Sequence, residues 1–266
     1  MRYAEHIPHN DLLPYVKCIW VLEAEQLQSE LIIPDGCVEL IFHFEDLYTV
    51  NQNGAQRSQS RAFIFGQIEK AIRLTPSGKT GMVGVRFQPF GLSAFLKVPL
   101  REFTNMSVDL PSIWGTKGRE LEEQLRDAFS NQERIVLLEN FLLEKLQPLE
   151  QLRRFQFATK TLRKPAEHIN LQELCHELNL SERQIERQFA RHIGIGAKRL
   201  HRIYRLQRAI QLIEQSNGTN LTHIAMDTGY YDQAHFNRDF KSIVHQSPRE
   251  YYRSNNAIGS LFLDPS

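Results

Sequence analysis

The sequence predicts an α+β protein with two domains: a mostly β N-terminal domain that also contains helices, and an all-α C-terminal domain. Three observations support this fold class. The C-terminal part contains one helical pattern twice, strand-like segments fill residues 14–90, and the two parts carry opposite net charge. We place the N-terminal domain at residues 1–148, the C-terminal domain at 149–256 and a tail at 257–266.

The strand candidates of the N-terminal part are rich in β-branched and aromatic residues. Turn sequences such as Pro34-Asp35-Gly36 and Pro76-Ser77-Gly78 separate them. The expected strands are 15–22, 38–44, 62–65 and 82–87. The pattern becomes helical after Leu92, with amphipathic helices expected at 118–129 and 131–146 and a linker at 146–151.

Residues 229–240, GYYDQAHFNRDF, are the most informative stretch of the chain. An amphipathic helix is expected before them, and a glycine turn leads into a second helix that begins near Asp232. Phe236 and Phe240 stand four positions apart and therefore face the core together. The polar side chains left on the outer face are partners for base edges and phosphates. Together these elements predict a helix-turn-helix, the unit that places a helix in the DNA major groove.

The same unit occurs upstream, at residues 171–193. Its apolar positions match the downstream copy at an offset of 50 in the first helix and 51 in the second, so the extra residue falls in the turn. Asn179 replaces Gly229 there, and asparagine tolerates the left-handed backbone that such turns often need. Ser181 and Gln184 are spaced to form a capping box. Two copies with one apolar pattern support the motif more strongly than either copy alone.

Residues 197–215 lie between the two copies and predict one long helix. They contain no proline or glycine and keep close to a 3.6-residue apolar period. At about 1.5 Å per residue the helix would be roughly 28 Å long. One turn of DNA advances about 34 Å, so two recognition helices held by it could enter successive major grooves. The polar side of this helix either faces solvent or contacts DNA phosphates. The cations on it are Lys198, Arg199, Arg202, Arg205 and Arg208.

From about residue 155 to 252 the chain resembles the tandem helix-turn-helix domain of AraC-type transcriptional regulators. The resemblance rests on Ala225, on residues 229–241 and on the closing sequence SPREY at 247–251. It implies a bacterial regulator that binds DNA in a sequence-specific manner.

The chain departs from the family pattern at two helix ends. Gly196-Ala197 replaces the usual Ser-Pro, and His245 replaces the usual glycine. In the N-terminal part, residues 34–40 and 84–91 with Trp114-Gly115 resemble the sensor-like domain of some AraC-type regulators. This second resemblance implies a cupin-like or barrel-like domain for effector binding or dimerisation.

The resemblance and the side-chain chemistry together give two sets of candidate DNA contacts. Arginine and glutamine form paired hydrogen bonds with guanine and adenine, and Glu186 could accept one from cytosine or only orient an arginine. The candidate base readers are Arg183, Gln184, Glu186, Arg187, Gln233, His235, Asn237 and Arg238. The candidate phosphate contacts are Ser181, Arg191, Lys198, Arg199, Arg202, Arg205 and Lys241.

Charge is divided between the two parts. The whole chain carries a net charge of +1, yet residues 151–266 hold 17 Lys and Arg against 11 Asp and Glu. A basic module joined to an acidic one fits nucleic-acid binding confined to the C-terminal part. No apolar run approaches the roughly 18 residues of a membrane span, and no signal peptide is visible. Cys18, Cys37 and Cys175 form no close pair, so we expect reduced thiols, a cytoplasmic location and no membrane contact.

Aromatic residues of the strands either line a ligand pocket or form plain core. If there is a pocket, Glu39 and Arg86 are its polar residues, as a buried or rim ion pair, and favour a small polar or zwitterionic effector. The N-terminal histidines lack metal-ligand spacing, so we expect neither a metal nor another cofactor. The candidate pocket residues are Trp20, Glu39, Phe42, Phe44, Arg86 and Phe87, with Phe65 and Phe90 in the same aromatic set.

We expect no enzymatic activity. Asp35 with Cys37, or Glu39 with Arg86, could be written as a catalytic pair, but Asp35 fits the turn and Cys37 a small buried residue. No nucleophile elbow, phosphate loop or dinucleotide fingerprint is present. Two alternatives stay open: a DNA-repair or modification enzyme with the same DNA-binding domain, and a purely architectural DNA-binding protein.

The sequence therefore predicts a transcriptional regulator that binds double-stranded DNA. A small-molecule effector would act by favouring the arrangement of recognition helices that matches the operator. A homodimer and a contact with RNA polymerase are open possibilities. The effector, the operator and the direction of regulation do not follow from the sequence.

Overall fold

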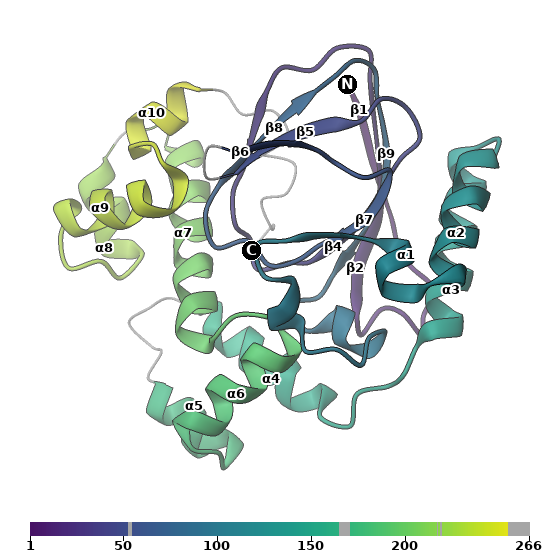
Figure 1. The fold of residues 1–266 in the computed structure, drawn as a ribbon. Helices are drawn as coiled ribbons and strands as arrows, with labels where there is room; N and C mark the ends of the chain where they lie inside the picture. The colour runs from purple at the N-terminus through teal and green to yellow at the C-terminus, as the bar shows by residue number, and fades with distance from the viewer. Residues whose placement is uncertain (53–54, 165–170, 217, 219, 255–266) are drawn as a thin grey trace.

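The computed structural model describes residues 1–52, 55–164, 171–216, 218 and 220–254. It contains an N-terminal domain of two sheets and a helical C-terminal domain, so the predicted two-domain α+β fold is confirmed (Figure 1). The sheets lie in the centre of Figure 1, with α2 and α3 on one side and the C-terminal helices on the other. No helix among these residues is long and apolar enough to cross a membrane. The predicted tail falls outside the described residues.

Two antiparallel sheets build the N-terminal domain. The larger has the order β1-β2-β9-β4-β7-β10, and the smaller has the order β3-β8-β5-β6. The strands of the larger sheet are β1 (Arg2–His6), β2 (Val16–Ala24), β9 (Thr80–Phe87), β4 (Glu39–His43), β7 (Ala62–Phe65) and β10 (Ser107–Asp109). Those of the smaller sheet are β3 (Glu30–Ile32), β8 (Ile72–Pro76), β5 (Tyr48–Gln52) and β6 (Ala55–Ser58). The four predicted strands correspond to β2, β4, β7 and β9.

The larger sheet is buried on both faces, and the alternation of side chains decides which residue faces which way. On β2, Ile19 and Val21 belong to the core that includes the helices, whereas Trp20 and Leu22 face the smaller sheet. β9 is buried along its whole length. One set of alternate residues therefore lines the space between the sheets.

Helices cover the outer face of the larger sheet. Two 3-10 turns, η1 (Gly91–Ala94) and η2 (Leu100–Phe103), precede α1 (Leu110–Trp114), α2 (Thr116–Asp127) and α3 (Asn131–Lys145). Leu121 and Leu125 of α2 and Leu138 and Leu142 of α3 are buried in the core shared with the strands. The two predicted helices agree with α2 and α3 to within two residues at each end.

The C-terminal domain contains the two predicted helix pairs, joined by one long helix. Its helices are α4 (Leu152–Leu162), α5 (Leu171–Leu178), α6 (Glu182–His192), α7 (Ala197–Gln215), α8 (Leu221–Asp227), α9 (Gln233–Val244) and α10 (Pro248–Arg253). The repeated units are α5-α6 and α8-α9, and α7 spans the predicted residues 197–215.

The turns and caps explain where these helices begin and end. Asn179 and Gly229 have φ values of 52° and 74°, so both turns use the left-handed backbone expected of them. The predicted capping box of Ser181 and Gln184 starts α6, and Asp232 caps α9 by accepting a hydrogen bond from the His235 amide at 2.6 Å. His245 ends α9 at a φ of 64°, a conformation that glycine adopts at lower free energy.

α7 packs against the N-terminal domain along its length. Leu200 and Ile203 belong to the buried cluster that contains the larger sheet. Further along, Leu206 and Ile210 share a second buried cluster with Leu31, Ile33 and Ala71 of the N-terminal domain. The two domains therefore have a common apolar interface centred on α7.

The turn at residues 34–36 is pressed against α7. Gln207 Nε2 of α7 donates a hydrogen bond to the Pro34 carbonyl at 2.6 Å, and Gln67 Nε2 donates one to the Gly36 carbonyl at 2.8 Å. Gly36 has a φ of 81°, and a Cβ there would lie 2.7 Å from Leu200 Cδ1. Only glycine fits this turn without displacing the helix.

Further hydrogen bonds cross the boundary between the domains. Thr104 Oγ1 donates to the Gly194 carbonyl at 2.7 Å, and the Ala71 amide donates to the Ile243 carbonyl at 2.8 Å. Both recognition units are thus attached to the N-terminal domain. The limits of the two domains as independent folding units stay a prediction.

Gly36→Ala should destabilise the protein more than Gly115→Ala. Both glycines have positive φ, but a Cβ at Gly115 has no atom within 4 Å, whereas one at Gly36 collides with α7. The collision should add about 1–3 kcal/mol to the loss in the free energy of unfolding, the usual effect of overpacking. Urea unfolding of the two variants measures the difference. Equal losses would mean that the turn shifts away from α7 without cost.

Candidate nucleic-acid interface and interdomain cavity

One face of α6 carries three arginines. Arg183, Arg187 and Arg191 follow at four-residue intervals, so they lie along one side of the helix, and all three are exposed. Ile185 and Phe189 face the core. The apolar pattern of α6 therefore turns its guanidinium groups outward, as a helix in the major groove requires.

Two predicted DNA contacts in the first turn of α6 form its cap. The Gln184 amide donates to Ser181 Oγ at 3.3 Å, and the Ser181 amide donates to Gln184 Oε1 at 2.8 Å. These bonds satisfy amides that the helix itself leaves unpaired. Ser181 and Gln184 thus stabilise the helix whether or not they contact DNA.

The carboxylate of Glu186 is directed toward the start of α7. A Cβ at Gly196 would collide with Glu186 Oε2, and Glu186 Oε1 is buried without a hydrogen-bond partner among the residues described. The glycine that replaces the usual serine at position 196 leaves room for this carboxylate. Glu186 therefore lies beside the α6–α7 junction.

α9 presents Arg238 and Lys241 to solvent. They stand three positions apart and therefore share one side of the helix. Arg238 occupies the position equivalent to Arg187 of α6 at the offset of 51. The two recognition helices thus expose an arginine at the same place.

The other predicted base readers of α9 make contacts within the domain. Gln233 Oε1 accepts a hydrogen bond from Thr222 Oγ1 at 2.8 Å. The His235 ring packs edge-on against Tyr230, with 5.3 Å between the ring centres. Asn237 Oδ1 is buried and has no hydrogen-bond partner in the part of the chain described.

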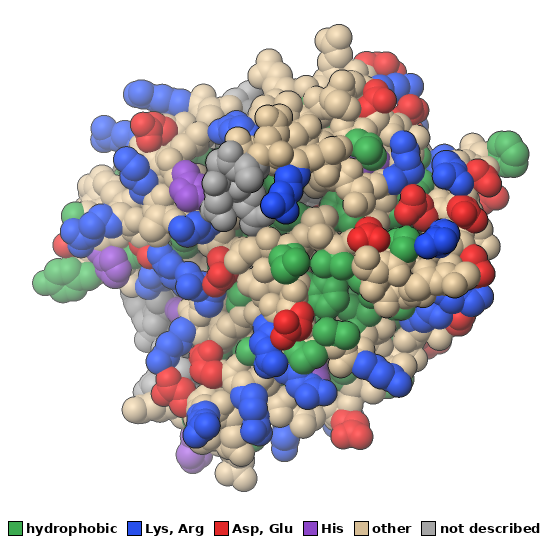
Figure 2. Space-filling model, viewed as in Figure 1, with side chains coloured by type: hydrophobic (Ala, Val, Ile, Leu, Met, Phe, Trp, Pro, Cys, Tyr) green, Lys and Arg blue, Asp and Glu red, His purple; other side chains and the backbone are tan. Residues whose placement is uncertain are grey.

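The first two cations of α7 are exposed but already form ion pairs. Lys198 Nζ lies 2.6 Å from Glu182 Oε1 of α6, and Arg199 Nε lies 2.9 Å from Glu69 Oε1 of the N-terminal domain. Such exposed pairs are weak, typically below about 1 kcal/mol, so phosphates can replace the carboxylates. Figure 2 shows Lys and Arg side chains gathered over the helical domain, on the left and lower side of the view.

Arg202 and Arg205 face inward toward Asp239 of α9. Arg202 Nε donates to Asp239 Oδ1 at 2.7 Å, and Arg205 lies 3.4 Å from Oδ2. The Tyr230 hydroxyl donates to the same carboxylate at 2.9 Å, and Arg205 stacks on the Tyr230 ring. Burial alone would raise the pKa of Asp239, but the bonds from Arg202 and Tyr230 outweigh burial and lower it. This cluster fixes α9 on α7.

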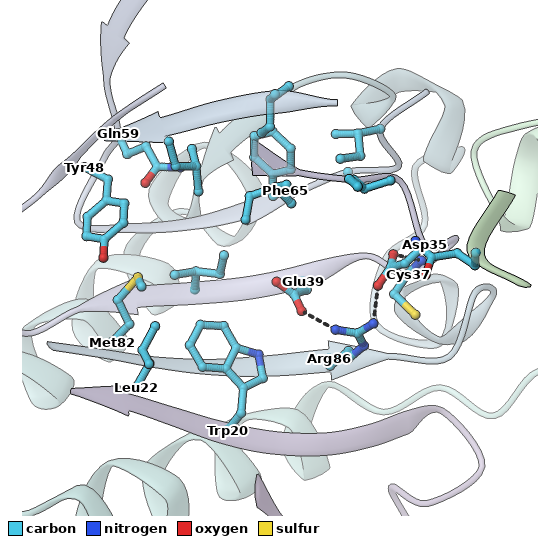
Figure 3. A pocket seen from close by; sticks show the side chains of 18 residues that line it. Trp20, Leu22, Asp35, Cys37, Glu39, Tyr48, Gln59, Phe65, Met82 and Arg86 are labelled. Carbon is cyan, nitrogen blue, oxygen red and sulfur yellow. Dashed lines mark hydrogen bonds and ion pairs between the residues drawn. The ribbon is translucent and has the colours of Figure 1, made fainter. Parts of the chain in front are cut away.

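A cavity of about 80 Å³ lies between the two sheets and reaches α7 (Figure 3). Most of its wall is apolar. Figure 3 shows Trp20 and Phe65 directed toward one another across it, with Tyr48 and Met82 further along. The described residues that line it are Trp20, Leu22, Ile32, Ile33, Asp35, Cys37, Glu39, Ile41, Tyr48, Gln59, Phe65, Gly66, Ile68, Ile72, Leu74, Met82, Arg86 and Gln207.

Three charged side chains meet at one end of the cavity (Figure 3). Arg86 forms an ion pair with Asp35, and its Nη1 lies 3.5 Å from Glu39 Oε1. Asp35 also accepts a hydrogen bond from the Cys37 amide at 2.8 Å, so it both closes the turn and holds the arginine. The expected ion pair of Glu39 and Arg86 is thus present, with Asp35 as a third member.

The C-terminal domain contributes Gln207 to the cavity wall. Its Nε2 is bonded to the Pro34 carbonyl, the residue next to Asp35. The acidic end of the cavity and the docking of the turn on α7 therefore involve the same few residues.

Comparisons with known proteins agree with the geometry of the C-terminal helices. Residues 174–254 match a family model described as a helix-turn-helix domain. The chain carries an AraC-type helix-turn-helix domain. An uncharacterized HTH-type transcriptional regulator of Haemophilus influenzae is 33% identical over 93 residues, 35% of this chain and 31% of the relative. The regulator MtrA of Neisseria gonorrhoeae is 27% identical over 92 residues, 35% of this chain and 30% of MtrA.

The chain thus spans about a third of the length of these curated relatives, and the matches have the length of the AraC-type domain. Residues 4–109 match a domain of unknown function (DUF6597). Among solved structures, ToxT from Vibrio cholerae resembles the whole chain at a TM-score of 0.48 and 11% identity, covering 95% of this chain and 98% of ToxT. That likeness is too distant to transfer a ligand.

The structure corrects half of the predicted pocket. Trp20, Glu39 and Arg86 line the cavity, but Phe42, Phe44 and Phe87 do not. Phe42 and Phe87 are buried in the core between the larger sheet and the helices, and Phe44 stacks under Arg134 of α3. The prediction was wrong because residues of opposite parity on one strand, such as Glu39 and Phe42, face opposite sides of a sheet.

Several residues of the cavity were not predicted from the sequence. Asp35 was expected only in the turn and Cys37 only in the core, and no role was expected for Tyr48, Gln59 or Gln207. Strand alternation from Glu39 would have found Ile41, and from Trp20 it would have found Leu22. No local signal identifies Gln207, because its contact with Pro34 joins residues 173 positions apart. Among the described residues, no three His, Cys, Asp or Glu side chains come together as in a metal site.

Glu39→Gln should reduce the dependence of stability on pH. Burial raises the pKa of Glu39 to about 7, with Asp35 adding to the rise and Arg86 opposing it. The folded protein therefore holds this proton more tightly than the unfolded chain, whose carboxyl has a pKa near 4.3. Ionisation of Glu39 thus lowers the free energy of unfolding progressively as the pH rises from about 4 to 7. Above that range the free energy of unfolding stays lowered by the full amount.

The stability of Glu39→Gln relative to the parent protein should therefore rise by about 1–3 kcal/mol between pH 5 and pH 8. Urea unfolding at the two pH values measures this change. Glu120→Gln, at an exposed position of α2, is the control and should show no such change. A constant difference for Glu39→Gln would contradict the assignment.

Proposed function

We propose that the protein is a sequence-specific transcriptional regulator that reads DNA with α6 and α9 and responds to a small molecule in the N-terminal cavity. One observation carries the DNA-binding part: the two recognition helices expose arginines at equivalent positions, and α7, a single helix of 19 residues, joins the helix pairs that contain them. Such a helix spans about 28 Å, close to one turn of DNA.

The candidate DNA contacts fall into two groups: exposed side chains that can reach DNA, and side chains that bind Asp239 within the domain. Arg183, Arg187 and Arg238 are exposed and suit guanine readout. Arg191, Lys198, Arg199 and Lys241 are exposed as well and suit phosphates. For Arg202 and Arg205 we propose a structural role on Asp239 in place of the phosphate contact.

The effector part rests on the shared wall of the cavity. Gln207 of α7 lines it, and the turn that carries Asp35 is pressed against the same helix. A ligand that binds one position of this turn better than another would change how α7 packs against the two sheets. The two recognition helices would then present a different spacing to the operator. Homodimerisation, contact with RNA polymerase and a cytoplasmic location stay predictions.

Arg238→Ala should lower specific DNA binding by about 1–3 kcal/mol and relax sequence preference, because one bidentate base contact is lost. Selection of binding sites from random DNA with the full-length protein gives the sequence preference. Arg249→Ala, at an exposed site of α10, is the matched control and should leave the preference unchanged. A preference that survives Arg238→Ala would remove Arg238 from base readout.

Lys198→Ala and Arg202→Ala should have different effects. Lys198→Ala should reduce the slope of log affinity against log salt by about 0.9, the contribution of one phosphate contact, and affect all sequences alike. Arg202→Ala should leave that slope unchanged and instead lower the free energy of unfolding, because it breaks the pair with Asp239. Salt titrations of binding together with urea unfolding distinguish the two roles. A slope reduced by Arg202→Ala alone would reverse the assignment.

A further inference from the structure

The acidic end of the cavity has more acidic than basic side chains. The charged residues in its lining are Asp35, Glu39 and Arg86, which gives two carboxylates for one guanidinium. Among the residues described, no other Lys or Arg is part of the lining. A ligand with a positive charge at this end would balance the second carboxylate, whereas an anion would face two like charges.

Glu39 is the carboxylate with capacity for a further partner. Asp35 makes the closer contact with Arg86 and also accepts the Cys37 amide. Glu39 lies at 3.5 Å from the same guanidinium, the outer limit of a hydrogen bond. The Trp20 side chain also hydrogen-bonds to Glu39. Since a carboxylate offers about four lone-pair sites, Glu39 can accept N–H groups from a ligand without losing Arg86 or Trp20.

A second acceptor lies at the same end. Gln207 is more than nine-tenths buried, and its amide orientation is set because Nε2 donates to the Pro34 carbonyl. Its Oε1 has no hydrogen-bond partner among the residues described. A buried acceptor without a partner is unfavourable, and a donor on a ligand would satisfy it. A ligand that fits this end should therefore donate hydrogen bonds to Glu39 and to Gln207 Oε1.

The remaining wall defines the body of the ligand. Trp20, Tyr48 and Phe65 supply aromatic surface, and aliphatic side chains of both sheets complete it. A flat or extended apolar group gains free energy by leaving water for this surface. Trp20 also lies where a cation can approach an aromatic ring, since it shares the cavity with Glu39.

We propose that the cavity binds a small hydrophobic amine, with its ammonium group between Glu39 and Gln207 and its apolar body against Trp20 and Phe65. The ammonium supplies a positive charge for the second carboxylate and donates hydrogen bonds to Glu39 and to Gln207 Oε1. As a signal, this binding rests on the proposed regulatory function: the amine would contact Gln207 of α7 directly and Asp35 of the docking turn through Arg86.

Three probes of one shape test the ligand class. Phenethylamine, phenethyl alcohol and hydrocinnamate share a phenyl ring and a short chain and differ in the charge of the head group. Isothermal titration of the full-length protein at about pH 7.5 should show the amine binding at least about tenfold more tightly than the alcohol. The carboxylate should bind more weakly than both. Tightest binding of the carboxylate, equal binding of all three, or no binding of the amine would overturn the proposal.

Two variants locate the head group. Glu39→Gln keeps the shape of the side chain and should reduce amine affinity to the level of the alcohol, while alcohol affinity stays unchanged. Gln207→Met removes the amide acceptor together with the hydrogen bond to the Pro34 carbonyl. It should weaken the amine about three- to tenfold and the alcohol less, and this difference keeps the test valid if Glu39→Gln does not fold. Glu120→Gln on α2 is the control and should bind all three probes as the parent does. Undiminished amine binding by both cavity variants would overturn the site.

Titration of the same protein preparation with double-stranded DNA separates this inference from the proposed function. If the protein prefers the amine but does not bind DNA, the proposed ligand site stands and the proposed regulatory function is wrong. If the protein binds DNA but does not prefer the amine, the proposed regulatory function stands and the proposed ligand class is wrong.

Discussion

The contact between the turn at residues 34–36 and α7 is the constraint on which the rest of the arrangement depends. Gln207 donates a hydrogen bond to the Pro34 carbonyl, Gln67 donates one to the Gly36 carbonyl, and Gly36 places no side chain between the turn and the helix. Displacing the turn would leave buried amides and carbonyls unpaired, which is costly in the interior. Because α7 connects the pair α5-α6 to the pair α8-α9, this one contact also sets where both recognition helices stand relative to the sheets.

Cations on α7 have different roles according to the side of the helix they occupy. Lys198 and Arg199 lie on the outside in weak ion pairs that another anion can replace. Arg202 and Arg205 lie against Asp239, where burial and the Tyr230 hydroxyl make the pairing stronger. The inner pair keeps α9 at a fixed angle on α7. The outer pair leaves positive charge at the surface beside α6.

Asp35 connects the cavity with the DNA-binding domain. Its carboxylate holds Arg86 at the acidic end of the cavity, and its backbone belongs to the turn that rests on α7. A change of charge at Glu39 or Arg86 therefore acts on the turn through one side chain. Coupling over this short path requires no rearrangement of the sheets, because the sheets, the turn and the helix are already in contact.

The sequence by itself determined what depends on local pattern: the repeated helix pairs, the cap at Ser181, the start of α9 near Asp232, the full length of α7 and the four central strands. The tertiary structure alone decided the short outer strands and the real lining of the cavity. Phe42 and Phe87 resembled pocket residues by composition, yet strand parity turns them toward the helices. Gln207 and Pro34 meet only because α7 packs against the N-terminal domain. Periodicity is a property of neighbouring residues, whereas such a contact depends on how distant elements pack, which no local pattern encodes.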